Sequence, residues 1–309
     1  MLTIQQTMNS FLNLIRNKED GGPFSRFKSW EYCHLNFREA HNLGRELNEN
    51  EVDYLALHLS FYLASWGMYR GSSFILQRDY KTHIDIVKRV FKPEYNELWD
   101  FDPSNLDDDR LQELASIVKT AYLDIASAYG DIPERYFVDD DGDGAPVSIT
   151  LITKILMGTF AVSPALDRFF KDGIKCFKKH SGSSEELGCS SHYDTETYFK
   201  EVIFNLFKFA KQHREELNCA DEATSFTYPL MKKVDMYFWE VGYEYGFYNA
   251  LVEKEKKLNG TTCFVGKKAR KPFEKLVSQI ATIFPEINTN GRNDLETIEN
   301  IKVQLYNRF

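Results

Sequence analysis

Asp167, in the segment SPALDRFF, is the residue of this sequence best placed to do chemistry. Ser163 and Pro164 are typical of a helix start, because serine caps the first turn and proline fits its first position. The sequence therefore predicts a helix over 164–179 with Asp167 in its first turn. A carboxylate there could stabilise developing positive charge and orient a water molecule. Alternatively, it is a helix-end charge that the helix dipole favours and that pairs with Lys171.

Arg78 and His83, in the segment RDYKTH, are a second pair of candidates. Their spacing resembles the Arg/His motif of the helical HEPN ribonucleases, in which both residues act on the scissile phosphate. The resemblance implies a metal-independent ribonuclease of a toxin or phage-defence type. Because short motifs also arise by chance, the alternative is an exposed, charged helix face.

The residues that precede Asp167 carry a further resemblance. GDGAPVSITLITKILMGTF places a helix after a glycine-containing loop, and SPALDRFF then adds a turn, a proline and an Asp followed by Arg and aromatic residues. This order resembles the helix–hairpin–helix DNA glycosylases. The resemblance implies an all-helical fold and a hairpin whose N–H groups hold a DNA phosphate. It also implies that Asp167 faces a base flipped out of the duplex.

Two departures from that family define the reaction that the resemblance implies. The acidic stretch DDDGDG replaces the family's hairpin, and no nucleophilic lysine lies between Ala145 and Ser148. Lys154 lies too far along the helix to take over that role. The resemblance therefore implies a monofunctional DNA glycosylase, which hydrolyses the N-glycosidic bond of a damaged or modified base with water. No cofactor is expected.

The expected substrate-binding residues are aromatic or cationic. An extruded base would be held by aromatic walls and nearby cations, for which the candidates are Trp66, Tyr69, Arg70, Arg168 and Trp239. DNA phosphates would be bound by the GKKARK segment, through Lys267, Lys268, Arg270 and Lys271. Such binding would be salt-dependent. The structural alternatives are core packing for the aromatic residues and solvated surface for the basic run.

The acidic segment VDDDGDGAP matches only half of a calcium-binding loop. Asp139, Asp141 and Asp143 have the ligand spacing, but Pro146 and Thr150 replace the later apolar residue and the bidentate Glu. The alternative is an acidic surface turn, for which Asp and Gly are suited. We predict no metal site and retain these three aspartates as the calcium candidates.

The composition indicates a globular protein and limits its partners. The 309 residues include 46 acidic and 38 basic side chains, so a nucleic-acid partner would require a local basic patch. The five cysteines form no CxxC pair, which favours free thiols in a reducing cytoplasm. The N-terminal segment does not resemble a signal peptide, and no apolar run is long enough for a membrane span. We therefore expect a cytoplasmic protein without a membrane partner; its oligomeric state is not predicted.

Helical periodicity dominates the chain and predicts an all-α fold. The expected helices cover 3–16, 51–69, 79–91, 109–129, 151–160, 164–179, 196–217, 228–257, 267–283 and 293–307. A Ser/Gly-rich stretch suggests an N-terminal lobe over 1–180, a loop or hinge over 181–197 and a C-terminal lobe over 198–309, although one domain is also possible.

Two acidic residues in the helix predicted over 228–257 leave a choice. Asp235 and Glu240 could be site carboxylates, or they could belong to an amphipathic core helix. A third hypothesis for function, beside the glycosylase and the ribonuclease, is a non-enzymatic helical interaction protein.

Overall fold

The architecture is known from a computed structural model that describes residues 3–16, 25–71, 73–129, 147–181, 187, 196–218 and 226–308. Every regular element within these ranges is a helix, which confirms the predicted all-α class. The α-helices are α1 (Ile4–Arg16), α2 (Lys28–Asn42), α3 (Glu49–Ser65), α4 (Ile84–Val90), α5 (Asp108–Ser127), α6 (Ile149–Thr159), α7 (Arg168–Ser181), α8 (Glu196–Gln212), α9 (Arg214–Asn218), α10 (Leu230–Leu258), α11 (Lys267–Ile283) and α12 (Asp294–Tyr306). The 3₁₀ turns are η2 (Phe74–Gln77), η3 (Tyr80–His83), η4 (Pro93–Leu98) and η5 (Pro103–Asn105).

Several helices begin where a side chain satisfies the backbone of the first turn. Asn48 and Glu51 form a reciprocal capping box at the start of α3. Asp107 accepts a hydrogen bond from the backbone N–H of Arg110 in α5, and Asn293 caps α12 in the same way. Since these bonds satisfy donors that a helix leaves open, the local sequence fixes these boundaries.

The chain forms two compact units. Unit 1 consists of Met1–Thr7, Arg168–Glu185 and Tyr237–Phe309, and unit 2 consists of Met8–Asp167 and Glu186–Met236. Helices α1 and α10 each contribute to both units. The expected lobes, over 1–180 and 198–309, do not have the same boundaries as these two units. Compact units depend on long-range packing, which the local sequence does not show. Most of the hinge expected over 181–197 lies outside the described residues.

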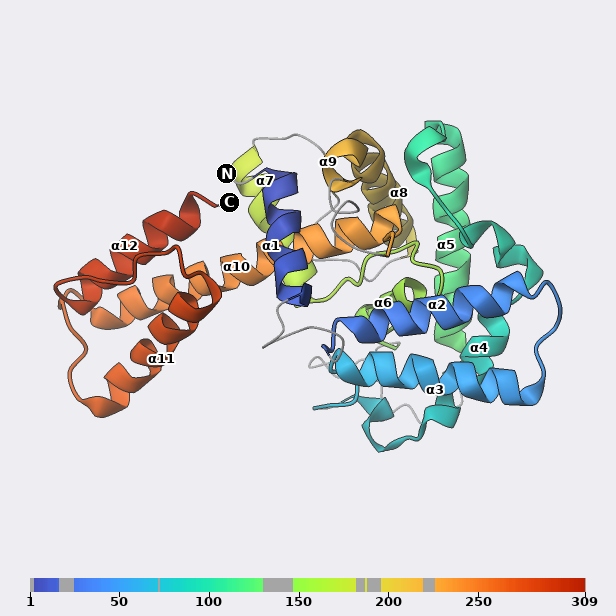
Figure 1. Cartoon of the computed structure of the whole chain (residues 1–309), viewed down its shortest axis with the longest axis horizontal. Helices are drawn as coiled ribbons and strands as arrows, with labels where there is room; N and C mark the ends of the chain where they lie inside the picture. The colour runs from blue at the N-terminus through green and yellow to red at the C-terminus, as the bar shows by residue number, and fades with distance from the viewer. Residues whose placement is uncertain are drawn as a thin grey trace. The chain divides into compact units, whose positions relative to one another are not determined.

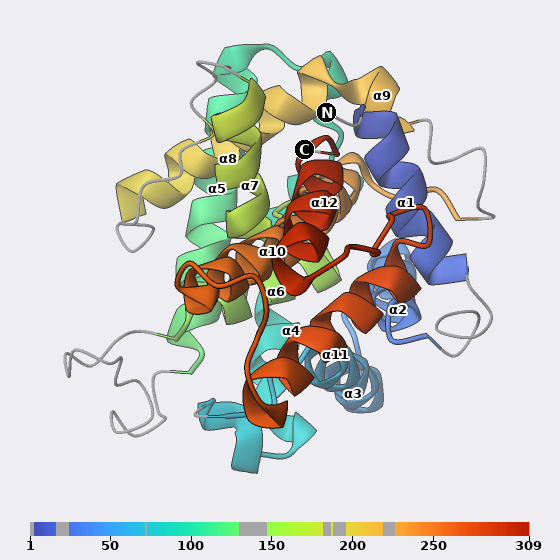
Figure 2. The same cartoon turned by 90° about the vertical axis from the view of Figure 1, so that its left-hand side faces the viewer.

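Unit 2 is built around α6, in which every residue from Leu151 to Thr159 is buried. Helices α2, α3 and α5 pack against it, and α8 packs on α5. In both views α2 and α3 lie side by side (Figures 1 and 2). A Cβ on Gly158 of α6 would lie 2.7 Å from Cε1 of Tyr62, so this glycine lets α3 approach closely.

Unit 1 depends on a close crossing of α7 and α10. A Cβ on Gly173 would lie 1.9 Å from the carbonyl oxygen of Phe238, and one on Gly242 would lie 1.8 Å from that of Phe169. Only residues without a Cβ allow this backbone contact. Helices α11 and α12 lie along the C-terminal part of α10 (Figures 1 and 2). Arg308, which follows α12, forms an ion pair with Glu244 of α10.

The predicted helices differ from the observed ones at several places. Helix α3 ends at Ser65 instead of residue 69, because Gly67 and Gly71 adopt positive φ angles of 75° and 64° in the turn that follows. The segment predicted over 79–91 is split between η3 and α4. Helix α2 was not predicted, since its buried face includes polar residues that weaken its periodicity.

Candidate functional site

Asp167 ends the irregular segment that connects α6 to α7. The prediction of a helix from residue 164 with a Ser163 cap is wrong, because α7 begins at Arg168. The hydroxyl of the fully buried Ser163 instead donates to the carbonyl oxygen of Pro164. The segment makes a sharp bend at Ala161, where φ is +58°.

Side-chain hydrogen bonds hold this connection in place. The carboxylate of Asp235 accepts from the backbone N–H of Ala165 at 2.9 Å. The hydroxyl of Thr153 accepts from the backbone N–H of Leu166, and the hydroxyl of Thr150 donates to the carbonyl oxygen of Leu166. Since buried backbone groups require partners, these bonds fix the backbone that carries Asp167.

The carboxylate of Asp167 pairs with a buried lysine. Lys154 Nζ of α6 lies 3.1 Å from Asp167 Oδ2; the lysine side chain is 4% exposed and the aspartate side chain 17%. A second pair, Lys232 with Asp235, is buried nearby at 2.6 Å. The ring of Trp66 lies 5.3 Å from Lys154 Nζ and 5.9 Å from Lys232 Nζ. We call these five residues the Asp167 cluster.

Tyr62 of α3 is electrostatically coupled to this cluster. Burial raises the pKa of Tyr62 well above its usual value, and the charges of Asp235 and Asp167 add to the effect. The phenol therefore stays protonated and can donate a hydrogen bond. The cluster thus combines two ammonium groups, two carboxylates and an indole ring beside a neutral phenol.

Trp66, Tyr69 and Arg70, which follow α3, have different environments. Trp66 is half-buried and belongs to the Asp167 cluster. The hydroxyl of Tyr69 is bonded to Ser60 Oγ at 2.9 Å and to His83 Nε2 at 2.8 Å. Arg70 is exposed, and its guanidinium group lies over Gly67. The contacts of these residues connect only Trp66 to the surroundings of Asp167.

The environment of His83 is that of a buried core histidine with hydrogen-bond partners on both ring nitrogens. His83 is fully buried, and its Nδ1 lies 2.9 Å from the hydroxyl of Tyr129. Burial lowers the pKa of His83 to about 4, so the ring is neutral at physiological pH. Arg78 is exposed. A ribonuclease histidine must reach the substrate, and the tyrosine partners and burial of His83 give it no access.

Trp239 and Arg168 belong to unit 1. Trp239 is buried, with its ring 5.3 Å from Phe169 and stacked 5.1 Å from Tyr243. This environment favours the packing alternative for Trp239. Arg168 is exposed, and its guanidinium group lies 4.8 Å from the ring centre of Phe169.

The basic candidates lie at the start of α11 in unit 1. Lys267, Lys268, Arg270 and Lys271 are all exposed there. Arg270 pairs with Glu274 at 3.0 Å, so part of its charge is neutralised. Cations at a helix N-terminus oppose the helix dipole, and this cluster therefore does not stabilise α11 electrostatically.

The calcium candidates Asp139, Asp141 and Asp143 lie outside the described residues. Within the described ranges, no group of three His, Cys, Asp or Glu side chains is arranged to hold a metal ion. Cys33 and Cys176 are buried free thiols, and Cys263 is an exposed one.

The other carboxylate considered in α10, Glu240, lies in unit 1 and is almost fully buried. Burial raises its pKa well above the usual value, and the charge of Glu244 one turn away raises it further. Burial therefore favours the neutral form of Glu240. Glu244 remains paired with Arg308, at 2.6 Å.

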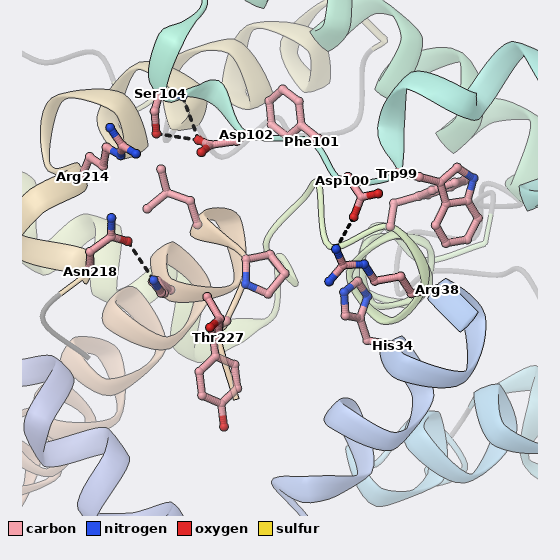
Figure 3. A pocket seen from close by; sticks show the side chains of 15 residues that line it. His34, Arg38, Trp99, Asp100, Phe101, Asp102, Ser104, Arg214, Asn218 and Thr227 are labelled. Atoms are coloured by element: carbon pink, nitrogen blue, oxygen red, sulfur yellow. Dashed lines mark hydrogen bonds and ion pairs between the residues drawn. The ribbon is translucent and has the colours of Figure 1, made fainter. Parts of the chain in front are cut away.

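A cavity of 460 Å³ in unit 2 was not predicted from the sequence. It is lined by α2, the segment 99–104, the end of α6, α9 and the residues around the start of α10, and we call it the His34 cavity. Figure 3 shows His34 and Arg38 on one side of this cavity and Arg214 and Asn218 on the other. No motif marks these residues, and α2, which carries two of them, was itself not predicted.

No protein-family model, curated protein or solved structure matches this chain. None of the helices in the described part of the chain combines the length and apolarity that a bilayer crossing requires.

Proposed function

We propose that the protein is a monofunctional DNA glycosylase that uses Asp167 to hydrolyse the bond between a modified base and its sugar. The observation that carries this proposal is the ion pair of Asp167 with the buried Lys154 on a loop fixed by hydrogen bonds. The pair places an ammonium group beside the carboxylate, and a side-chain exposure of 17% leaves Asp167 within reach of a substrate.

The reaction makes use of that carboxylate. As the base departs with the bonding electron pair, positive charge develops on the sugar, as in other glycoside hydrolyses. Asp167 would stabilise this charge and orient a water molecule. The water oxygen then bonds to the anomeric carbon, and its released proton neutralises the departing base. This outcome leaves the DNA backbone intact.

The remaining parts of the proposal concern DNA binding. Trp66 is the aromatic candidate close to Lys154, and it would stack against the extruded base. The exposed cations at the start of α11 would bind phosphates, so DNA affinity should fall steeply as salt increases.

A base-release assay with two matched variants tests this function. Duplex DNA with damaged bases and hypermodified phage DNA are incubated with the protein, treated with alkali and examined for strand breaks. We expect breaks with the wild type and at least a hundredfold slower release with Asp167→Asn. Asp172→Asn is the control, because Asp172 lies near the start of α7 with only a long, 3.7 Å contact to Lys175.

Two results would contradict the glycosylase. One is the absence of base release from every substrate, and the other is an Asp167→Asn variant as active as the wild type. Circular dichroism and the unfolding midpoint of each variant establish that the fold is retained.

One observation favours the non-enzymatic alternative. Tyr54, Leu57 and Phe61 follow one face of α3, and each is at least half exposed. Large apolar side chains grouped on a surface are typical of protein-interaction sites. Failure of the base-release assay would make this alternative the stronger one.

A further inference from the structure

We propose that the His34 cavity is a binding site for a small organic anion, a carboxylate or phosphate attached to a flat ring. The cavity volume of 460 Å³ lies in the range typical of sites for small molecules. No member of the Asp167 cluster lines the cavity. This site is therefore independent of the proposed glycosylase activity.

The charges of the cavity wall favour an anion. Three cationic side chains line it against two carboxylates: Arg38, Arg214 and Lys233 against Asp100 and Asp102. Because Arg38 is paired with Asp100, the anionic group of the ligand would bind at Arg214.

Both carboxylates of the wall already have partners. Asp100 pairs with Arg38 at 2.5 Å. Asp102 accepts from the backbone N–H and the hydroxyl of Ser104 at the start of η5. Figure 3 shows both interactions at the edge of the cavity. These carboxylates are therefore held by the protein itself.

Arg214 is the cationic side chain that we expect to bind the anionic group of the ligand. Among the described residues, no acidic side chain forms an ion pair with its guanidinium group, although it lines the cavity. Lys233 also lines the cavity; it is almost fully buried, and Asn218 Oδ1 accepts from its Nζ at 2.7 Å. Arg214 and Asn218 lie one helical turn apart on α9, so both face the same part of the ligand. A guanidinium group matches the geometry of a carboxylate or phosphate.

His34 supplies a polar group of the opposite kind. This side chain is buried, and its Nδ1 lies 2.8 Å from the carbonyl oxygen of Thr159, so Nδ1 carries the proton. Desolvation lowers the pKa of His34 to about 4, and the ring is neutral at pH 7. Its Nε2 is then an acceptor, with no hydrogen-bond partner among the described residues. A hydroxyl or N–H group on the ligand would complement it.

Aromatic side chains supply the surface for a flat ring. Trp99, Phe101 and Phe160 line the cavity, and the rings of Trp99 and Phe160 lie 4.5 Å apart. The expected ligand therefore has a flat ring, one anionic group and one hydrogen-bond donor.

Calorimetry with two probes tests the proposal. Adenosine 5′-monophosphate carries a phosphate and 4-hydroxyphenylacetate a carboxylate; both have a flat ring and a donor. Adenosine and 4-hydroxyphenylacetamide are their neutral controls. We expect at least one anion to bind, and its neutral analogue to bind at least tenfold more weakly. Binding of one anion only identifies the preferred acidic group.

Two variants locate the binding. Arg214→Gln should lower the affinity for the anion about tenfold, because a charge-assisted hydrogen bond is lost. Arg292→Gln removes the same charge from an exposed side chain of unit 1 and should leave affinity unchanged. Thr227→Trp fills the cavity at an exposed wall position and should abolish binding.

Three results would overturn the proposal. The first is that neither probe binds at millimolar concentration, and the second is that the neutral analogues bind equally well. The third is that neither Arg214→Gln nor Thr227→Trp changes the affinity. Because these results concern the His34 cavity alone, they are independent of base release by Asp167.

Discussion

Gly242→Ala should destabilise unit 1, because it places a methyl group inside a backbone contact. The added Cβ would lie 1.8 Å from the carbonyl oxygen of Phe169 and 2.7 Å from the backbone nitrogen of Gly173. Ordinary contacts of this kind are 3.4 Å or longer, so α7 and α10 must separate by roughly 1.5 Å.

The magnitude follows from two opposing effects. Overpacking costs about 3 kcal/mol at the upper end of its usual range. The upper end applies here because the methyl group meets backbone atoms, which cannot move aside as a flexible side chain can. Alanine in a helix gains about 1 kcal/mol over glycine. The free energy of unfolding should therefore fall by about 2 kcal/mol.

Gly246→Ala is the matched control, one turn further along α10. The nearest atom to its added Cβ lies 3.9 Å away, an ordinary contact. The free energy of unfolding should rise by about 1 kcal/mol, because only the helix propensity changes. The same substitution thus has opposite signs at positions four residues apart.

Denaturant unfolding combined with hydrogen exchange provides the assay. Exchange should accelerate in peptides from α7 and α10 of Gly242→Ala and should slow in the same α10 peptides of Gly246→Ala. Gly173→Ala combined with Gly242→Ala should be less than additive, since both methyl groups force apart the same crossing. The reasoning is refuted if Gly242→Ala is as stable as the wild type.

Two further predictions concern pH. Burial lowers the pKa of both His34 and His83 to about 4, so the unfolded chain binds more protons between pH 6.5 and 4. Their contribution to stability is therefore complete above pH 6.5 and falls as the pH drops towards 4. In urea unfolding measured at several pH values, His83→Gln should make the free energy of unfolding depend less on pH over this range. The prediction is contradicted if the variant shows the same pH dependence as the wild type. Glu240 has a raised pKa, so the folded state keeps it neutral while the unfolded chain ionises above about pH 4.5. Glu240→Gln should raise the free energy of unfolding at pH 7 and have little effect at pH 4. Glu244→Gln should lower it at pH 7, because this change breaks the pair with Arg308. A Glu240→Gln variant that is less stable at pH 7 than Glu244→Gln would contradict the raised pKa of Glu240.

The fold class was accessible from the sequence because apolar residues recur at helical spacing. The segments 3–16, 109–129, 267–283 and 293–307 correspond to α1, α5, α11 and α12 within one or two residues. Local capping fixes several of these boundaries, as Asp107 does for α5. Apolar periodicity does not predict α2, because the polar residues Glu31 and His34 lie on its buried face.

The environment of Asp167 was accessible only in part. The sequence predicts Asp167 in the first turn of a helix, whereas the residue precedes α7, and the sequence does not identify the partner of its carboxylate. The position of Lys154 along its helix does not predict this pair, yet its long side chain reaches Asp167. The tertiary packing also decides the role of His83, since burial between two tyrosines cannot be inferred from its spacing to Arg78.

By itself, the sequence determined the all-α class, most of the helices and the exposed basic start of α11, because these depend on local periodicity and charge. Tertiary structure alone decided the division into two units, the Gly173–Gly242 crossing and the His34 cavity. Each of these joins segments that are far apart along the chain. Their geometry depends on which helix faces meet in space, and residue spacing within one segment does not encode that information.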